Sequence, residues 1–140
     1  MTTKTSVGEK ELMKLHLTVL ESQFALCQLP ADADVPAWAL GELVSVTRTA
    51  QELSVVCGEE MVPEGITAER GWRCLAVKGP FSLELAGVLA QLTRPLAESG
   101  VPVFALSTFD TDYLLVKKER LADASAAFRR NGHVVESPKR

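Results

Sequence analysis

The order of apolar patterns over residues 72–136 restricts the fold of this chain more than any other feature. One short apolar run, residues 72–77, precedes a stripe at helical spacing. Two more runs, residues 101–106 and 113–116, precede a second helical stripe and a last run at 134–135. Short apolar runs predict strands, and apolar residues three and four apart predict amphipathic helices. The predicted order, strand-helix-strand-strand-helix-strand, is the split βαβ or ferredoxin-like arrangement.

Both predicted helices have recognisable ends. The apolar stripe of the first contains Leu85, Val88, Leu89, Leu92 and Leu96. Ser82 is placed to cap it and Gly100 to terminate it. Pro95 lies within the stripe, so we expect one kinked helix and not two helices. The stripe of the second contains Leu121, Ala124, Ser125 and Phe128, and that helix should end at Asn131-Gly132.

The first half of the chain follows the same plan less clearly. Alternation over residues 12–20 predicts a strand with Leu15, Leu17 and Val19 on one face. A run at 24–29 extends it as a hairpin or a bent strand, 43–47 and 53–57 form a strand pair, and 58–71 is expected to be loop. With its helices short or missing, this half should depend on the second for its core. We therefore predict an α+β chain of two units, residues 12–70 and 71–137.

The polar turn Ser107-Thr108-Phe109-Asp110-Thr111-Asp112 carries more functional groups than a hairpin needs. The predicted topology places it at the same end of the sheet as the start of the first helix. A helix N-terminus favours a carboxylate, and Asp110 or Asp112 can receive an ammonium or guanidinium group. A purely local role in the turn remains open for both acids and for Phe109, with Asp110 the more strongly accounted for by turn chemistry.

Three segments of the second half of the chain resemble the ACT domain, in the branch shared by aspartate kinase regulatory regions and CASTOR-type arginine sensors. They are GVL at residues 87–89, GVPVFALST at 100–108 and TDYLLV at 111–116. The resemblance extends from Lys78 to Val135. It implies two ferredoxin-like ACT units in tandem, the first degenerate.

The resemblance also implies a function. ACT domains bind small ligands, usually amino acids, at interfaces between domains, and a single copy of this length is expected to form a homodimer that regulates a protein partner. By resemblance, the ligand contacts fall on Leu85, Gly87, Val88, Ser107, Thr108, Phe109 and Asp112. Leu85 stands where an acidic side chain is expected for an arginine ligand, so the amino acid remains unnamed.

Composition and motifs exclude several other classes. The net charge of -3 gives no footprint for nucleic acid. We expect no membrane association and a cytoplasmic location, because no apolar stretch approaches the roughly 20 residues of a bilayer span and no signal peptide is seen. Cys27, Cys57 and Cys74 are expected to be buried thiols. We find no metal, cofactor or catalytic motif and predict no enzyme. A structural ACT protein without a ligand is the alternative, and a small mutase or acyltransferase has the least support.

Overall fold

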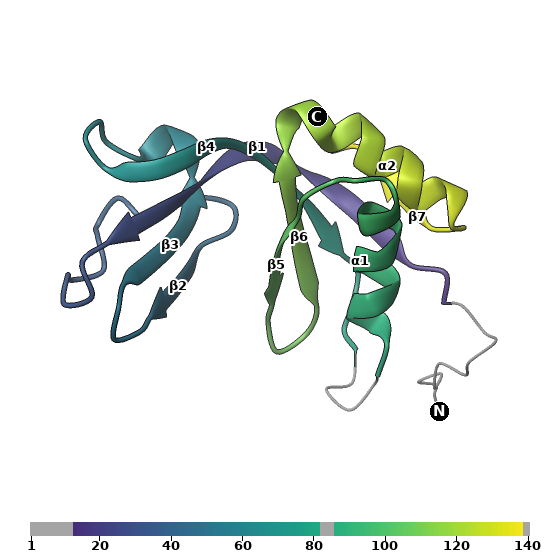
Figure 1. Cartoon of the computed structure of the whole chain (residues 1–140), viewed down its shortest axis with the longest axis horizontal. Coiled ribbons are helices and arrows are strands. Elements are labelled where there is room, and N and C mark those ends of the chain that lie inside the picture. The colour runs from purple at the N-terminus through teal and green to yellow at the C-terminus, as the bar shows by residue number, and fades with distance from the viewer. Residues whose placement is uncertain (1–12, 82–85, 139–140) are drawn as a thin grey trace.

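The computed structural model describes residues 13–81 and 86–138, and within them one sheet dominates (Figure 1). Its order is β2-β3-β1-β4-β6-β5, with β7 beside β1. The strands are β1 (His16–Leu29), β2 (Ser45–Arg48), β3 (Leu53–Gly58), β4 (Thr67–Val77), β5 (Phe104–Ser107), β6 (Asp112–Lys117) and β7 (Val134–Glu136). The helices are α1 (Val88–Glu98) and α2 (Leu121–Arg130), with short 3-10 turns at Glu59–Met61 and Lys118–Arg120. The β1–β7 pair is parallel and the other pairs are antiparallel.

The order β4-α1-β5-β6-α2-β7 confirms the ferredoxin-type succession predicted from the sequence. One strand enters from outside that succession. The first part of β1 lies between β4 and β7, with Leu17 opposite both Val77 and Val135. The second unit is therefore completed by a strand from the beginning of the chain. The tandem relation of two units and their boundary at residue 70 remain predictions.

The strand β1 joins the two parts of the sheet. Its register against β4 shifts twice, between Val19 and Gln23 and between Phe24 and Leu26, so the bent-strand alternative is the correct one. Its later part pairs with β3. The loop expected at residues 58–71 is wrong in its second part, because β4 begins at Thr67. There the backbone pairs with β1 although the side chains of Thr67 and Glu69 are exposed, so no apolar signal marked it.

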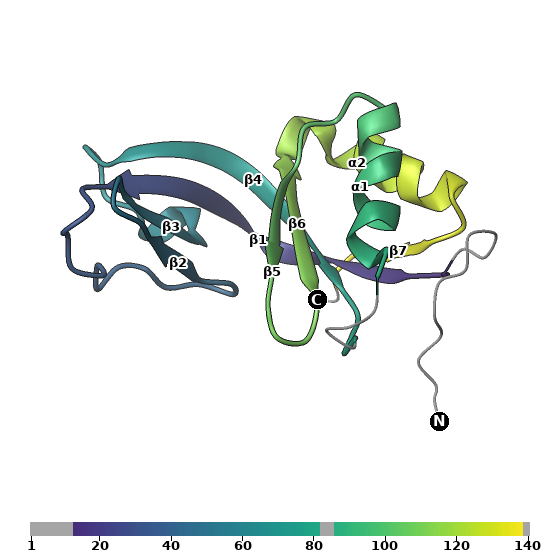
Figure 2. The ribbon, with the colours of Figure 1, turned by 60° about the horizontal axis from the view of Figure 1, so that its bottom comes forward.

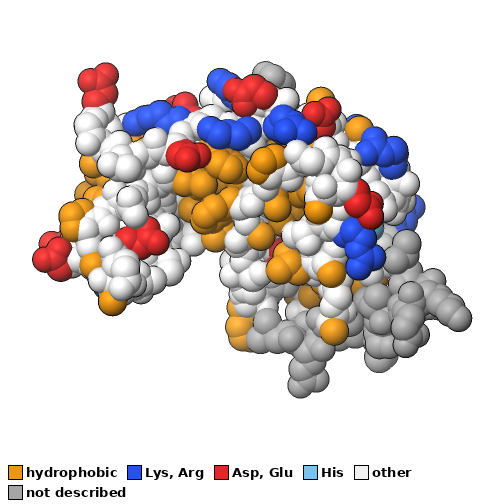
Figure 3. All heavy atoms as spheres, viewed as in Figure 1, with side chains coloured by type: hydrophobic (Ala, Val, Ile, Leu, Met, Phe, Trp, Pro, Cys, Tyr) orange, Lys and Arg blue, Asp and Glu red, His pale blue; other side chains and the backbone are white. Residues whose placement is uncertain are grey.

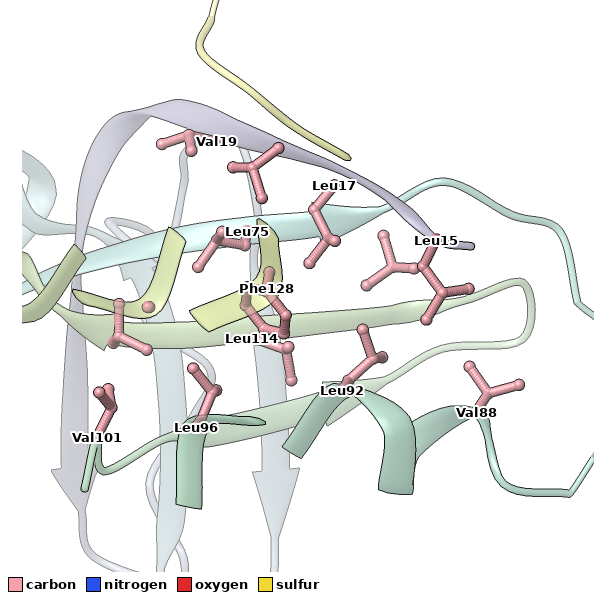
Figure 4. Packing of buried hydrophobic residues seen from close by; sticks show 14 residues of the cluster. Leu15, Leu17, Val19, Leu75, Val88, Leu92, Leu96, Val101, Leu114 and Phe128 are labelled. Atoms are coloured by element: carbon pink, nitrogen blue, oxygen red, sulfur yellow. The ribbon is translucent and has the colours of Figure 1, made fainter. Parts of the chain in front are cut away.

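Both helices cover the same face of the β4–β6 part of the sheet (Figure 2). Leu92 and Leu96 of α1 and Phe128 of α2 are fully buried against Leu75 and Leu114 of the sheet (Figure 4). The alternation predicted for β1 is confirmed as well, since Leu15, Leu17 and Val19 enter this cluster.

Two details of α1 differ from the prediction. The helix begins at Val88, because Gly87 before it has φ of 90° and breaks the helical path. Ser82, the predicted cap, lies outside the described residues. Leu89 is 41% exposed and does not belong to the buried stripe, which consists of Val88, Leu92, Pro95 and Leu96.

The end of α1 agrees with the sequence. The helix continues through Pro95 as one element. Gly100 has φ of 71°, and the Val101 N–H donates to the Leu96 carbonyl at 2.8 Å. A glycine in the left-handed region is the usual way to satisfy the last carbonyls of a helix.

Neither of the two described helices covers the opposite face of the sheet. Phe24, Val56, Trp72, Cys74 and Leu115 are buried there beneath half-buried apolar side chains. Figure 3 shows apolar side chains gathered in the concave middle of the molecule. Cys27 and Cys57 lie in a third cluster at the other side of β1 and β3, so the prediction of three buried thiols is confirmed. Neither described helix is long and apolar enough to cross a membrane.

Candidate functional site

The turn between β5 and β6 and the start of α1 border one open hollow of about 230 Å³. The juxtaposition expected from the topology is therefore present. The hollow is lined by Phe81, Gly87, Val88, Leu89, Ser107, Thr108, Phe109, Asp110, Thr111 and Asp112. Two carboxylates, three hydroxyls and apolar side chains thus face a space of small-ligand size.

Local hydrogen bonds give the turn its shape. The Thr108 N–H donates to the Thr111 carbonyl at 2.8 Å. The Thr108 hydroxyl donates to the same carbonyl at 3.2 Å and accepts from the Thr111 N–H at 3.3 Å. Side chains that bond to nearby backbone are typical turn formers. Thr108 therefore has a structural role whether or not it also contacts a ligand.

A second set of contacts fixes the turn against the segment after β4. The Thr111 hydroxyl donates to the Val77 carbonyl at 2.7 Å, and the Phe81 N–H donates to the Asp110 carbonyl at 2.8 Å. Gly79 makes this approach possible, because a Cβ there would lie 2.8 Å from the Asp110 carbonyl oxygen. The wall of the hollow is thus held by contacts with the end of β4 and with the residues that follow it.

Asp112 is held by its neighbour across the hairpin. Ser107 and Asp112 are opposite one another at the end of the β5–β6 ladder, and the Ser107 hydroxyl donates to Asp112 Oδ1 at 2.6 Å. A hydroxyl bound to one carboxylate oxygen orients the group and leaves the second oxygen able to accept from a cation. The arrangement favours Asp112 over Asp110 as an oriented acceptor, because Asp110 makes its described contact through its backbone carbonyl.

The opposite wall is the beginning of α1. The first bond within the helix runs from the Gln91 N–H to the Gly87 carbonyl at 3.0 Å. The N–H groups of Val88, Leu89 and Ala90 precede it and have no carbonyl within the helix to bind. Gly87, the N-cap residue, has no side chain with which to cap this end. A helix start of this kind attracts a carboxylate.

The structure brings together six of the seven residues predicted for the site. Gly87, Val88, Ser107, Thr108, Phe109 and Asp112 all border the hollow, while Leu85 lies outside the described residues. Phe109 is 79% exposed at the tip of the turn. Phe81 and Leu89 were not predicted. The helical stripe assigned Leu89 to the core, and nothing in the local sequence distinguished Phe81 from an ordinary turn residue.

A second hollow, of about 290 Å³, lies in the first half of the chain beside Ser22, Gln23, Glu60 and Met61. Its cation, Arg70, donates to the carbonyls of Glu59, Val62 and Pro63 at 3.2–3.4 Å and so closes the turn after β3. The helical element on its described lining is the three-residue 3-10 turn Glu59–Met61, which is too short to offer a helix N-terminus for a carboxylate. The hollow at α1 is the better candidate because it offers groups for both ends of a zwitterion.

In the described part of the chain, no three His, Cys, Asp or Glu residues come together as a group that could hold a metal ion.

Comparison with known proteins identifies the family. The model of the ACT domain matches residues 67–130, and a second model, of an N-terminal domain, matches residues 22–65. The chain belongs to the ACT-domain family.

Solved structures agree with this assignment. A protein of Agobacterium tumefaciens is 32% identical over 92% of this chain and 97% of its own, with a TM-score of 0.87. The regulatory subunit of Thermus thermophilus aspartate kinase is 11% identical over 91% and 98% of the two chains, with a TM-score of 0.56. The aspartate kinase of Clostridium acetobutylicum is 10% identical over 93% of this ACT-domain protein and 36% of the kinase, with a TM-score of 0.63. At these identities the kinases are related to this protein by fold.

Proposed function

We propose that this ACT-domain protein is a non-enzymatic regulatory module that binds a free amino acid in the hollow between α1 and the β5–β6 turn. The observation that carries the proposal is the pairing of a helix start, preceded by Gly87, with an oriented carboxylate across a hollow of about 230 Å³. The helix start would receive the ligand carboxylate, and Asp112 would receive its ammonium group.

We further propose that the protein acts as a homodimer with the ligand near the seam. The strand β5 is at the edge of the sheet, and Phe104–Ser107 contains no charge, proline or bulge to prevent pairing with another strand. Two copies of β5 related by a two-fold axis would form one continuous sheet. Leu89 and Phe109, both exposed, lie beside the hollow and would be available to the partner.

One observation favours the alternative, an ACT protein that has lost its ligand. The hydroxyls of Ser107, Thr108 and Thr111 each already bind a group of the protein itself. Such a turn is stable without a ligand. In that case the dimer would form and would not respond to small molecules.

A thermal-shift panel of the common amino acids tests ligand binding. At a ligand concentration of 100 times Kd, binding adds about 2.7 kcal/mol to the free energy of unfolding, which raises the melting temperature by several degrees. Asp112→Asn should remove the shift, whereas Asp34→Asn, the same change in an exposed loop, should keep it. A panel in which no amino acid shifts the wild-type protein would support the ligand-free alternative.

The dimer is tested separately by sedimentation equilibrium. Ala105→Lys places a charge on the exposed side of β5 and should lower the measured mass toward 15.2 kDa. Val46→Lys, the matched change on the other edge strand β2, should leave the mass unchanged. Dissociation by Val46→Lys alone would place the interface at β2 and would contradict the proposed seam.

A further inference from the structure

The segment that leads into β1 is held by two side-chain acceptors from distant parts of the chain. The Met13 N–H donates to Gln91 Oε1 of α1 at 3.0 Å. The Leu15 N–H donates to Nδ1 of His133, just before β7, at 3.1 Å. The Val134 N–H in turn donates a hydrogen bond to the Leu15 carbonyl at 2.9 Å. A neutral imidazole thus takes the place of a backbone carbonyl at the start of the β1–β7 ladder.

This contact requires one protonation state of His133. Nδ1 can accept only when it carries a lone pair, so the ring is neutral and its proton is on Nε2. The side chain is 6% exposed and its ring lies against Phe128, with 6.2 Å between the ring centres. Burial lowers the pKa of His133 below its ordinary value, which agrees with a ring held neutral at pH 7.

The charges around the ring do not favour an imidazolium. Charged or titratable groups on the elements that pack around it are Arg94 on α1, Arg129 and Arg130 on α2, Lys14 and His16 beside Leu15, and Glu136 on β7. Arg94 borders the same small hollow of about 50 Å³ as His133, together with Gln91, Pro95 and Asn131. Arg129 donates to the Val135 carbonyl and Arg130 to Ser99 Oγ. No carboxylate lies among the described residues that line this hollow, so a proton on His133 has a cation and no anion beside it.

We propose that His133 is an acid-sensitive latch. While its ring is neutral it keeps Met13–Leu15, the segment before β1, bound to α1 and β7, and protonation of the ring releases this segment. A proton on Nδ1 would point one donor at another, the Leu15 N–H, so the hydrogen bond and the imidazolium exclude each other. The pairing of β1 with β4 begins at Leu17 and does not use this bond. The release is therefore confined to the residues before Leu17. It also breaks the hydrogen bond between the Met13 N–H and Gln91 of α1, the helix that borders the hollow at the β5–β6 turn.

Amide hydrogen exchange on the full chain tests the latch. Rates for Leu15 and for Leu75, a fully buried strand residue, are measured at pH 7.5 and pH 5.0 and divided by the intrinsic rate at each pH. The Leu15 protection factor should fall roughly tenfold or more at pH 5.0, while that of Leu75 stays constant. Equal protection of Leu15 at the two pH values would overturn the proposal.

Two variants separate the latch from general acid sensitivity. His133→Asn keeps an acceptor close to the position of Nδ1 and does not titrate, so Leu15 protection should no longer depend on pH. His16→Gln removes the other, exposed histidine and should keep the wild-type response. If His133→Asn does not fold, the wild-type ring is titrated by NMR instead. A Leu15 amide shift that stays constant while the His133 ring titrates would then rule out the latch.

Discussion

The Ser107 hydroxyl donates a 2.6 Å hydrogen bond to Asp112 Oδ1 across the end of the β5–β6 ladder. The bond gives the carboxylate a fixed direction at the border of the α1 hollow. It also occupies one of the acceptor positions of the carboxylate that a ligand could use. Substituting Ser107 and Asp112 separately therefore distinguishes a role of Asp112 in ligand binding from a role in the turn alone.

Ser107→Ala and Asp112→Asn should have different effects. The pair is near the surface, so either change should alter the free energy of unfolding by less than about 1 kcal/mol. Asp112→Asn removes the charge and should abolish binding of the amino acid found in the thermal panel. Ser107→Ala leaves the charge and should weaken binding by roughly tenfold or less, because only the orientation is lost. Isothermal calorimetry measures both, and equal loss in the two variants would contradict a charge-based role.

The hydrogen bond between the Thr111 hydroxyl and the end of β4 should stabilise the folded protein. Thr111→Val removes the hydroxyl that binds the Val77 carbonyl at 2.7 Å. Leaving a partly buried carbonyl without its donor should cost about 1–3 kcal/mol in urea unfolding. Thr111→Ser keeps the hydroxyl and is the matched control, with the smaller loss expected from one methyl group. If both variants unfolded at the same urea concentration, the hydroxyl would not be the stabilising group.

Gly79 should tolerate no larger residue. An alanine Cβ there would lie 2.8 Å from the Asp110 carbonyl oxygen and 3.0 Å from Thr111 Cβ, so the turn would have to move away from β4. Gly79→Ala should therefore destabilise by about 1–3 kcal/mol and should also weaken ligand binding. Lys78→Ala, at the exposed neighbouring position, should do neither. Wild-type stability and binding in Gly79→Ala would show that the turn is not braced here.

The buried face of α1 can be tested within one helix. Leu92 is fully buried between α1 and the sheet, whereas Leu89 is 41% exposed. Leu92→Ala should cost about 2–5 kcal/mol. In the Ala105→Lys background, where the proposed dimer is dissociated, Leu89→Ala should change the free energy of unfolding by less than about 0.5 kcal/mol. Urea denaturation at one protein concentration provides the comparison. A large loss in Leu89→Ala in that monomeric background would contradict the exposed position of Leu89 on α1.

Local periodicity predicted the elements of this fold but not all of their neighbours. The alternation of Leu15, Leu17 and Val19 and the spacing of Leu92 and Leu96 follow from which face is buried, and both predictions are confirmed. The place of β1 between β4 and β7 depends on pairing of His16 with Val134, far apart in the chain. No local pattern encodes that partner, because several buried strands have equivalent apolar faces.

The site was predictable where topology determined it. Two strands and one helix of known direction bring the β5–β6 turn to the start of α1, and the structure confirms this meeting. The helix start was wrong because Leu85 matched the stripe, whereas the left-handed conformation of Gly87 begins the helix at Val88. Phe81 escaped prediction because its contact with Asp110 forms through the backbone, which the side-chain pattern does not reveal.

The three cysteines should be inert toward thiol reagents in the native protein. Burial raises the pKa of Cys57 to about 11 and that of Cys74 to about 12, and it also raises the pKa of Cys27. Because the thiolate is the reactive form, at pH 8 only about one part in a thousand of Cys57 is reactive. Ellman's reagent should therefore detect no fast-reacting thiol without denaturant and three in urea. Val46→Cys, a half-exposed position on β2, is the positive control and should react at once. Rapid reaction of a wild-type cysteine at pH 8 would mean that its strand opens easily, and the residue labelled would identify which part of the sheet does so.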